Sequence, residues 1–267
     1  MRRSCTFIDL LAIAILLFMH TGCATKPCAP CEATVASPRL ADAKGGASAS
    51  GSYYALPGIE HGPLQSPVNI LSDAVEGGKH TIEYGHGDGA QQVDNLGHTV
   101  QLGFGRGIKT ELDGKSYELM QVHFHTPSEH LIDGITYPME MHIVHSRAGL
   151  LASDPPDYLV IALLFRMGGP NRFIEEFLGA IPTQEGQSAK VEDVFIVDVL
   201  SPDVDVASID YYHYRGSLTT PPYTESVNWL VAKEIMQAGP AQIQRINLLE
   251  GDNARHVQPL YRREIDD

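Results

Sequence analysis

The stretch Gln121-Val122-His123-Phe124-His125 decides which fold and which site this sequence can form. Alternate residues of a β-strand point to the same face of a sheet. His123 and His125 therefore share one face with Gln121, while the apolar residues between them point to the other face. This alternation predicts a strand with one apolar face in the core and two imidazoles side by side on the opposite face.

A second predicted strand follows at residues 139–144, with the sequence MEMHIV, and it carries His142. The dipeptide Asp133-Gly134 lies between the two strands and is typical of a two-residue hairpin turn. If this turn closes a hairpin of the two strands, His125 and His142 lie directly opposite each other. Their Cβ atoms are then expected about 4.5–5.5 Å apart.

Three imidazoles from two neighbouring strands are the donor set of a zinc site, in which each nitrogen lies about 2.0–2.1 Å from the ion. Three protein ligands leave the fourth position for water, as in catalytic rather than structural zinc sites. The predicted ligands are His123, His125 and His142. A ligating histidine usually donates its other N–H to an acceptor. Gln121 and Glu140 stand two residues from a predicted ligand, on the same faces, and are predicted to be these acceptors.

Two further histidines do not fit this pattern. His145 has the opposite parity to His142, and His130 stands outside the constellation. Both are interpreted as hydrogen-bonded buried or surface histidines without a ligand role. The alternative for the whole group is three unrelated histidines on one sheet face, and the shared parity and flanking acceptors argue against it.

The rest of the chain indicates a mainly β (α+β) fold. Its 267 residues fit one domain of ordinary size, and 43% hydrophobic with 19% charged residues is a globular balance. Short alternating runs are separated by turn residues, and residues 158–165 read as a strand buried on both faces. Helices are expected only at 171–178, 233–237 and 240–247. We predict a single domain with a large, mostly antiparallel central sheet and small peripheral helices.

Charge excludes two classes of partner. The chain has 19 Lys and Arg against 33 Asp and Glu, a formal net charge of -14, and no basic block. A nucleic-acid binder needs a basic face to neutralise phosphates, and docking on anionic lipid needs one too. No apolar run reaches the roughly 18 residues of a membrane-spanning helix.

The N-terminus is predicted to be an export signal over residues 1–22. Two arginines precede the apolar run Leu10–Met19, which is the pattern of a signal peptide. The small residues before Cys23 are similar to a bacterial lipoprotein box, in which the cysteine becomes lipidated. His20 stands where that box prefers an aliphatic residue. An ordinary cleaved signal or an uncleaved anchor is therefore the alternative.

Residues 23–52 are predicted to be a flexible tether, rich in Ala, Gly, Ser and Pro, before a folded domain at 53–267. Cys28 and Cys31 lie within the tether. They are interpreted as a local disulfide or two free thiols, because no histidine follows for haem attachment. All four cysteines precede the folded domain, which excludes a disulfide or a thiolate metal site there.

Seven motifs in order resemble the bacterial branch of the α-class carbonic anhydrases, over about residues 65–265. They are Gln65–Ile70, Gly97–Thr99, Gln121–His125, Ser128–His130, Glu140–His145, Gly216–Pro222 and Gln258–Leu260. The resemblance implies that a zinc-bound hydroxide attacks carbon dioxide and gives bicarbonate and a proton. Carbonic anhydrase is itself the reference case for zinc lowering the pKa of water to about 7.

The resemblance also implies roles for individual residues. Thr219 would accept a hydrogen bond from the hydroxide and donate its own proton to Glu129. His98 matches the position of the family's proton shuttle, and its alternative is a surface histidine without a role. Asn253 and the two predicted acceptors would support the ligands. The implied substrate pocket, which could equally be core packing, consists of Val144, Val160, Leu218, Thr220, Val227 and Trp229.

The chain departs from the family pattern in three places. The aromatic segment that usually precedes Gln65 is missing, together with its tyrosine at the active-site rim. Leu96 replaces an asparagine that normally orders pocket water, and Tyr223 stands where secreted members often have a cysteine. None of these changes removes a predicted zinc ligand.

The leading functional prediction is a zinc-dependent carbonic anhydrase that acts on carbon dioxide and bicarbonate outside the cytoplasm, in the periplasm or at the cell surface. A lipid anchor through Cys23 would tether it to a bacterial membrane. The alternatives are a catalytically weak binding or adhesion module on the same scaffold, and a zinc esterase as a side activity. Retention of all three predicted ligands argues against the inert module, and the sequence leaves the oligomeric state open.

Overall fold

The computed structural model describes residues 62–85, 87–200 and 208–267. The predicted signal peptide at 1–22, the predicted tether at 23–52 with Cys23, and the first residues of the predicted domain lie outside these ranges. Within the described ranges, no helix is both long and apolar enough to cross a membrane.

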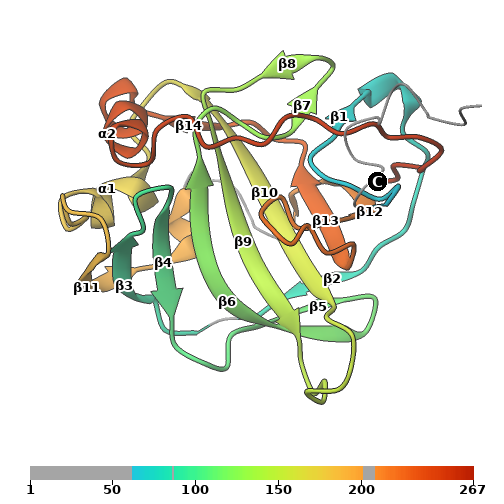
Figure 1. The fold of residues 1–267 in the computed structure, drawn as a ribbon, viewed down its shortest axis with the longest axis horizontal. Helices are drawn as coiled ribbons and strands as arrows, with labels where there is room; N and C mark the ends of the chain where they lie inside the picture. The colour runs from blue at the N-terminus through green and yellow to red at the C-terminus, as the bar shows by residue number, and fades with distance from the viewer. Residues whose placement is uncertain (1–61, 86, 201–207) are drawn as a thin grey trace, which may run out of the picture. The chain divides into compact units, whose positions relative to one another are not determined.

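One sheet of eleven strands organises the described part of the chain (Figure 1). Its main path is β11-β3-β4-β6-β9-β10-β13-β12, with β14 beside β10, β5 beside β6 and β2 beside β5. A second, three-stranded sheet has the order β1-β7-β8. The strands are β1 (Asn69–Ile70), β2 (Ile82–Tyr84), β3 (Ala90–Asn95), β4 (Val100–Phe104), β5 (Lys109–Leu112), β6 (Lys115–His125), β7 (Leu131–Ile132), β8 (Ile135–Thr136), β9 (Met139–Arg147), β10 (Tyr158–Met167), β11 (Gln187–Val194), β12 (Tyr211–Gly216), β13 (Val227–Ala232) and β14 (Met236–Ala238).

The large sheet is mixed but mostly antiparallel, which confirms the predicted fold class. Only β13 and β14 run parallel to their neighbour β10 among the described strand pairs of this sheet. The strands β6, β9 and β10 lie side by side at its centre (Figure 1). Long central strands give a rigid platform for side chains that must keep fixed distances.

Two α-helices and two 3-10 turns complete the described elements. The helices are α1 (Arg172–Leu178) and α2 (Pro240–Glu250), and the turns are η2 (Ser72–Ala74) and η3 (Ile196–Val199). Both helices were predicted. Asn171 caps α1, since its side chain accepts a hydrogen bond from the backbone N–H of Ile174.

The predicted helix at 233–237 is wrong. This segment instead ends in the short strand β14, whose Met236 pairs in parallel with Phe165 of β10. Met236 and Ala238 are buried on one side of the chain, and Gln237 between them is exposed. Pairing with β10 therefore overrides the local helical preference of a short segment.

The apolar core has two layers, one on each face of the sheet. Val122 and Phe124 of β6 belong to the larger cluster, together with Ile143 of β9. Val144 and Trp229 belong to the smaller cluster on the opposite face. Strand β10 contributes alternate residues to both clusters, which confirms that it is buried on both faces.

The predicted register of the two histidine strands is wrong by two residues. Asp133 and Gly134 do form a turn with positive φ values of 53° and 77°, but it closes the small hairpin β7–β8. In the β6–β9 ladder, His123 lies opposite His142, and His125 lies opposite Glu140. A shift of two residues keeps the faces unchanged, because side chains repeat every second residue. The three histidines therefore still share one face.

Candidate active site

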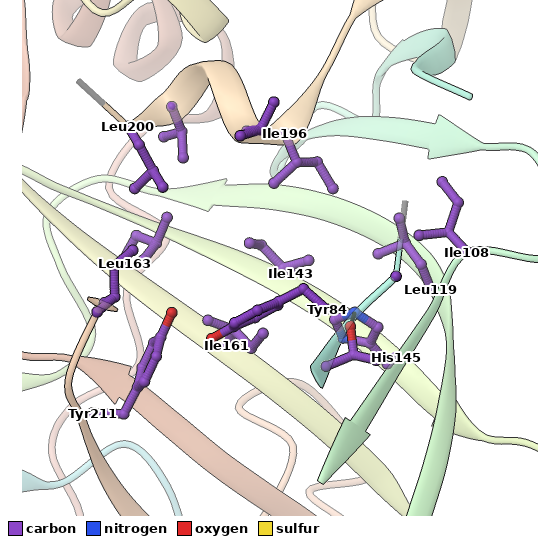
Figure 2. A pocket seen from close by; sticks show the side chains of 15 residues that line it. Tyr84, Ile108, Leu119, Ile143, His145, Ile161, Leu163, Ile196, Leu200 and Tyr211 are labelled. Atoms are coloured by element: carbon purple, nitrogen blue, oxygen red, sulfur yellow. Dashed lines mark hydrogen bonds between the residues drawn. The ribbon is translucent and has the colours of Figure 1, made fainter. Parts of the chain in front are cut away.

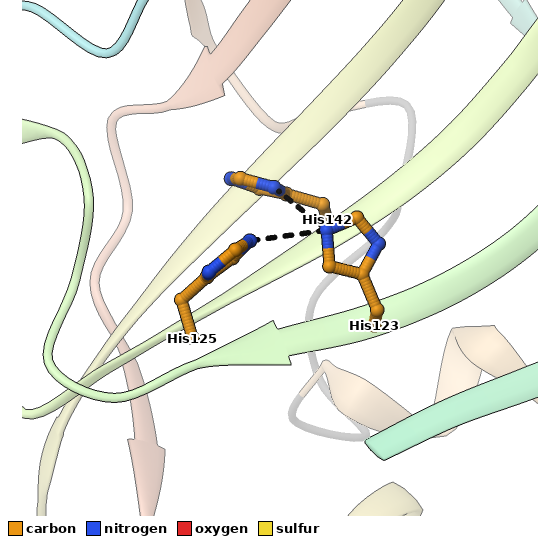
Figure 3. A group of neighbouring side chains, drawn as sticks. All are labelled: His123, His125 and His142. Carbon is orange, nitrogen blue, oxygen red and sulfur yellow. Dashed lines mark hydrogen bonds between the residues drawn. The ribbon is translucent and has the colours of Figure 1, made fainter. Parts of the chain in front are cut away.

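The imidazoles of His123, His125 and His142 converge on one point above the sheet (Figure 3). The Nε2 atom of His123 lies 3.0 Å from Nε2 of His125 and 3.3 Å from Nδ1 of His142. Two of the rings come from β6 and the third from the adjacent strand β9. Three separate imidazoles thus present one nitrogen each to a common centre.

These nitrogen positions fit a zinc ion. In a tetrahedral site with Zn–N distances of about 2.0–2.1 Å, two ligand nitrogens lie about 3.3 Å apart. Burial lowers the pKa of His123 well below its usual value, and the charges of the other two imidazoles lower it further. Burial also lowers the pKa of His125, to about 4, and that of His142. The rings are therefore neutral near pH 7, which is the form that binds metal.

The outer nitrogens of two of these rings are held by acceptors. Nδ1 of His123 donates to Oε1 of Gln121 at 2.9 Å, and Nε2 of His142 donates to Oε1 of Glu140 at 2.7 Å. Each acceptor fixes the tautomer and the tilt of its ring, so that the opposite nitrogen faces the common centre. Both acceptors are the residues expected from the sequence.

Glu140 is the centre of a buried network that the sequence did not reveal. Its Oε2 accepts the backbone N–H groups of Glu129 and His130 at 2.9 and 2.8 Å, and its Oε1 lies 2.6 Å from Nδ1 of His130. On the other side of His130, Nε2 lies 2.7 Å from the hydroxyl of Tyr214. His130 is thus a buried, hydrogen-bonded histidine that braces the acceptor of His142. No local pattern links residues 130, 140 and 214, so only the fold could show this contact.

Burial raises the pKa of Glu140, but favourable electrostatic interactions with His130 and His142, including the hydrogen bonds from these rings, lower it well below its ordinary value. The carboxylate therefore stays ionised although its side chain is fully buried. An ionised acceptor strengthens the electron donation of His142 toward the common centre.

Glu129 lies beside two of the three imidazoles, those of His125 and His142. Oε1 of Glu129 accepts the backbone N–H of Arg255 at 2.9 Å, and its Oε2 lies 3.5 Å from Nε2 of His125. Burial raises the pKa of Glu129 to about 7, and hydrogen bonds from the Arg255 backbone and the Thr219 side chain oppose that rise. Thr219 is itself buried. The influence of Thr219 on the pKa of Glu129 indicates that the two side chains predicted from sequence lie near each other.

The loop that carries Thr219 is held in place by a hydrogen bond from the indole of Trp229. Its Nε1 donates to the backbone oxygen of Ser217 at 3.1 Å. The backbone N–H of Ser217 donates to the hydroxyl of Ser66 at 3.1 Å. Gly216 precedes this loop and packs so closely that a Cβ added to it would collide with the Ser66 hydroxyl and the Trp229 indole. The position therefore requires glycine for close approach rather than for a special φ.

A cleft opens above the histidines. Its lining consists of Leu96, Gly97, His98, Thr99, Gln101, Gln121, His123, His125, Thr220, Glu250, Asp252 and Asn253. His98 is exposed, and its Nδ1 donates to the backbone oxygen of Leu96 at 3.0 Å, so that Nε2 is left for other contacts. Asn253 joins the two walls, because its side chain donates to the backbone oxygens of His98 and Phe124.

The residues expected to form the substrate pocket split into two groups. Thr220 lines the cleft. Val144, Val160, Val227 and Trp229 belong to the smaller apolar cluster, and Leu218 packs against it. The indole of Trp229 lies 4.9 Å from the His142 ring, centroid to centroid. These five residues form an apolar cluster, called the apolar wall below, which reaches His142 through Trp229, and none of the five is among the residues that line the cleft.

His145 points to the opposite side of the sheet. Its Nε2 lies 3.1 Å from the hydroxyl of Thr110, and its Nδ1 lies 3.3 Å from the backbone oxygen of Leu159. It lines an apolar cavity of about 170 Å³ between the sheet and η3 (Figure 2). Burial lowers its pKa to about 4. His145 is therefore a buried, hydrogen-bonded histidine on the face opposite to His142, as predicted from its odd spacing from His142 along the strand.

Comparison with known proteins places the chain in a family. Residues 54–267 match the model of the eukaryotic-type carbonic anhydrases. A carbonic anhydrase of Pectobacterium atrosepticum is 36% identical over 208 residues, which cover 77% of this chain and 80% of the relative. A carbonic anhydrase of Neisseria gonorrhoeae is 36% identical over 206 residues, covering 76% and 77%.

Solved structures agree with this assignment. The α-carbonic anhydrase of Thermovibrio ammonificans in complex with sulfanilamide has a TM-score of 0.70 and 32% identity, covering 79% of this chain and 89% of that one. The carbonic anhydrase Cah3 of Chlamydomonas reinhardtii with acetazolamide has a TM-score of 0.68 and 29% identity, covering 85% and 99%. Family model, relatives and fold agree, and the chain belongs to the α-class carbonic anhydrases, zinc enzymes that hydrate carbon dioxide.

Proposed function

We propose that this chain hydrates carbon dioxide with a zinc ion held by His123, His125 and His142. The observation that carries the proposal is the convergence of three neutral imidazole nitrogens at 3.0 and 3.3 Å, which matches the spacing of zinc ligands. When bound, zinc supplies a Lewis acid that makes hydroxide available at neutral pH, the effect for which carbonic anhydrases are the reference case.

Thr219 and Glu129 orient the attacking oxygen. The Thr219 hydroxyl has one proton to donate, and an ionised Glu129 can only accept. The hydroxyl therefore donates to the carboxylate and presents its own lone pairs toward the centre. An attacking O–H group then donates to Thr219 and points a lone pair at the substrate. The influence of Thr219 on the pKa of Glu129, and the position of Glu129 beside His125 and His142, support this assignment.

The apolar wall receives the substrate. Carbon dioxide is small and uncharged, so it is held by apolar surface rather than by ion pairs. Val144, Val160 and Trp229 are buried apolar residues on the sheet face that carries His142, and Thr220 lines the cleft above the histidines. The substrate would lie against this wall, within reach of the oxygen oriented by Thr219.

The test of this function is stopped-flow measurement of carbon dioxide hydration with the purified protein. We expect activity with one zinc bound at this centre, loss of activity on removal of zinc by a chelator, and recovery when zinc is added back. Equal hydration rates before and after complete removal of zinc would exclude the proposed mechanism.

His98 is proposed to carry the released proton to solvent. Each hydration event releases one proton, and histidine is the side chain whose ordinary pKa suits transfer near neutrality. His98 lines the cleft, is exposed, and keeps Nε2 available because Nδ1 is held by Leu96. The position of His98 between the centre and solvent supports this role.

We expect His98→Ala to lower turnover in weakly buffered solution and to leave kcat/KM for carbon dioxide nearly unchanged, because proton release follows the chemical step. Added imidazole should restore turnover. Measurement by stopped flow across buffer concentrations checks this result. Turnover equal to that of the wild type in weak buffer would mean that protons leave by another path.

We also propose that the chain is exported to the periplasm or cell surface and anchored there by a lipid on Cys23. Support comes from the two arginines near the N-terminus, the apolar run Leu10–Met19 and the small residues before the cysteine.

Cys23→Ser should release the protein from membranes and abolish lipid labelling. An intact mass of the wild-type protein without an acyl chain would reject the anchor.

A further inference from the structure

A second cluster of metal-binding side chains lies away from the active site. His80 precedes β2, and His213 is in β12, the strand at the end of the main path of the large sheet. The C-terminal end lies beside this strand (Figure 1), where Asp266 and His213 form an antiparallel bridge with backbone hydrogen bonds of 2.7 and 3.0 Å. The backbone therefore fixes the positions of His213 and Asp266 relative to each other.

The donor atoms of this cluster lie close enough together to hold one ion. Oδ1 of Asp266 lies 2.8 Å from Nδ1 of His213 and 3.3 Å from Nε2 of His80. One donor atom from each of the three residues lies within 4.8 Å of the other two. Zinc ligands at about 2.0–2.2 Å from the ion lie about 3.3 Å apart, so these atoms need to move little to coordinate one.

The outer nitrogen of His80 is held by a carboxylate, as in many metal sites. Its Nδ1 lies 2.7 Å from Oδ2 of Asp113, and the other oxygen of Asp113 accepts the backbone N–H of Thr81 at 2.9 Å. Such a pair fixes the ring orientation and raises the basicity of the opposite nitrogen, here Nε2. His80 is thus directed toward Asp266 by a residue from a third segment, the turn between β5 and β6.

Charge and access also suit a divalent cation. Asp113 and Asp266 place two carboxylates against the His80 ring, and negative charge of this kind attracts a cation. The side chains are 21%, 13% and 36% exposed for His80, His213 and Asp266, so an ion can reach them from solvent.

We propose that His80, His213 and Asp266 form a second zinc site, separate from the catalytic centre. Asp113 positions His80 and does not coordinate the ion, and water completes the coordination. His213 and Tyr214 are neighbours on one strand and point to opposite faces of the sheet. Tyr214 contacts the catalytic network through His130, so the two sites lie on opposite sides of β12 and bind independently.

The test is zinc stoichiometry of the untagged protein, by elemental analysis and by titration of the metal-free protein with zinc. The wild type should bind two zinc ions per chain. Asp266→Asn and His80→Gln should bind one and keep carbon dioxide hydration unchanged, which also shows that they fold. His142→Ala should likewise bind one ion, now at the second site, and the combination of His142→Ala with Asp266→Asn should bind none.

Two controls sharpen the assignment. His256→Ala removes an exposed histidine outside the cluster and should still bind two zinc ions. Asp113→Asn should weaken binding at the second site by about 10- to 100-fold, the usual cost of losing a carboxylate that holds a ligating histidine. One zinc ion in the wild type, or two in both Asp266→Asn and His80→Gln, would overturn the proposal. The first result would identify the cluster as a group of hydrogen-bonded side chains only.

Discussion

His142→Ala is expected to abolish carbon dioxide hydration and tight zinc binding at the catalytic centre. The substitution removes Nδ1 of His142, one of three converging nitrogens, and leaves the Glu140 carboxylate buried without that partner. Activity should fall by about 10³-fold or more, because the pKa of water rises again from about 7 to far above neutrality when the ion is lost. Elemental analysis and stopped-flow hydration measure the two losses separately.

The matched control for this substitution is His256→Ala. His256 is an exposed histidine that contacts none of the three imidazoles among the described hydrogen bonds and ring contacts, so zinc content and hydration should stay at wild-type levels. Circular dichroism of both variants reports whether the fold is kept. Tight zinc binding at the catalytic centre in a folded His142→Ala protein would contradict the assignment of three ligands.

Thr219→Ala should keep the catalytic zinc and lower hydration by about 10²-fold or more, the scale expected for loss of a group that orients a reacting atom. The hydroxyl is the only part of Thr219 that can join the attacking oxygen to Glu129. Its removal leaves the imidazoles and their acceptors in place, because none of the described hydrogen bonds of those rings involves Thr219. The expected signature is a lower kcat/KM with unchanged zinc content.

Thr219→Ser tests whether the hydroxyl itself is responsible. Serine keeps the donor and acceptor and removes only a methyl group, so most of the activity should remain. Glu129→Gln should resemble Thr219→Ala, since an amide can donate to the hydroxyl and reverse its orientation. Near-normal hydration in Thr219→Ala would show that the attacking oxygen is oriented by another group.

Strand parity explains why the candidate ligands could be found from sequence. The face on which His123, His125 and His142 lie depends only on counting residues along two strands. The predicted register was wrong by two residues, because the chain leaves β6 after His125 and forms a separate hairpin before β9. An error of one residue would have separated the imidazoles, whereas an error of two left them on the same face.

The β-bulge in β6 shows a limit of the same reasoning. The ladder with β9 shifts between Leu119 and Gln121, and Met120 between them is 50% exposed. As a result, Leu119 joins the same apolar cluster as Val122, although strict alternation would place them on opposite faces. Nothing in the local pattern marks this extra residue, since it depends on how the partner strand pairs.

By itself, the sequence determined the fold class, two of the helices, and the face shared by Gln121, Glu140 and the three histidines. Each of these depends on patterns that act over a few residues, namely period-two alternation, turn dipeptides and helix caps. The tertiary structure decided which distant groups meet. The network of His130, Glu140 and Tyr214 and the cluster of His80, His213 and Asp266 each join separate segments. Such contacts depend on strand order and long-range register, which are set by burial of the whole sheet rather than by any local pattern.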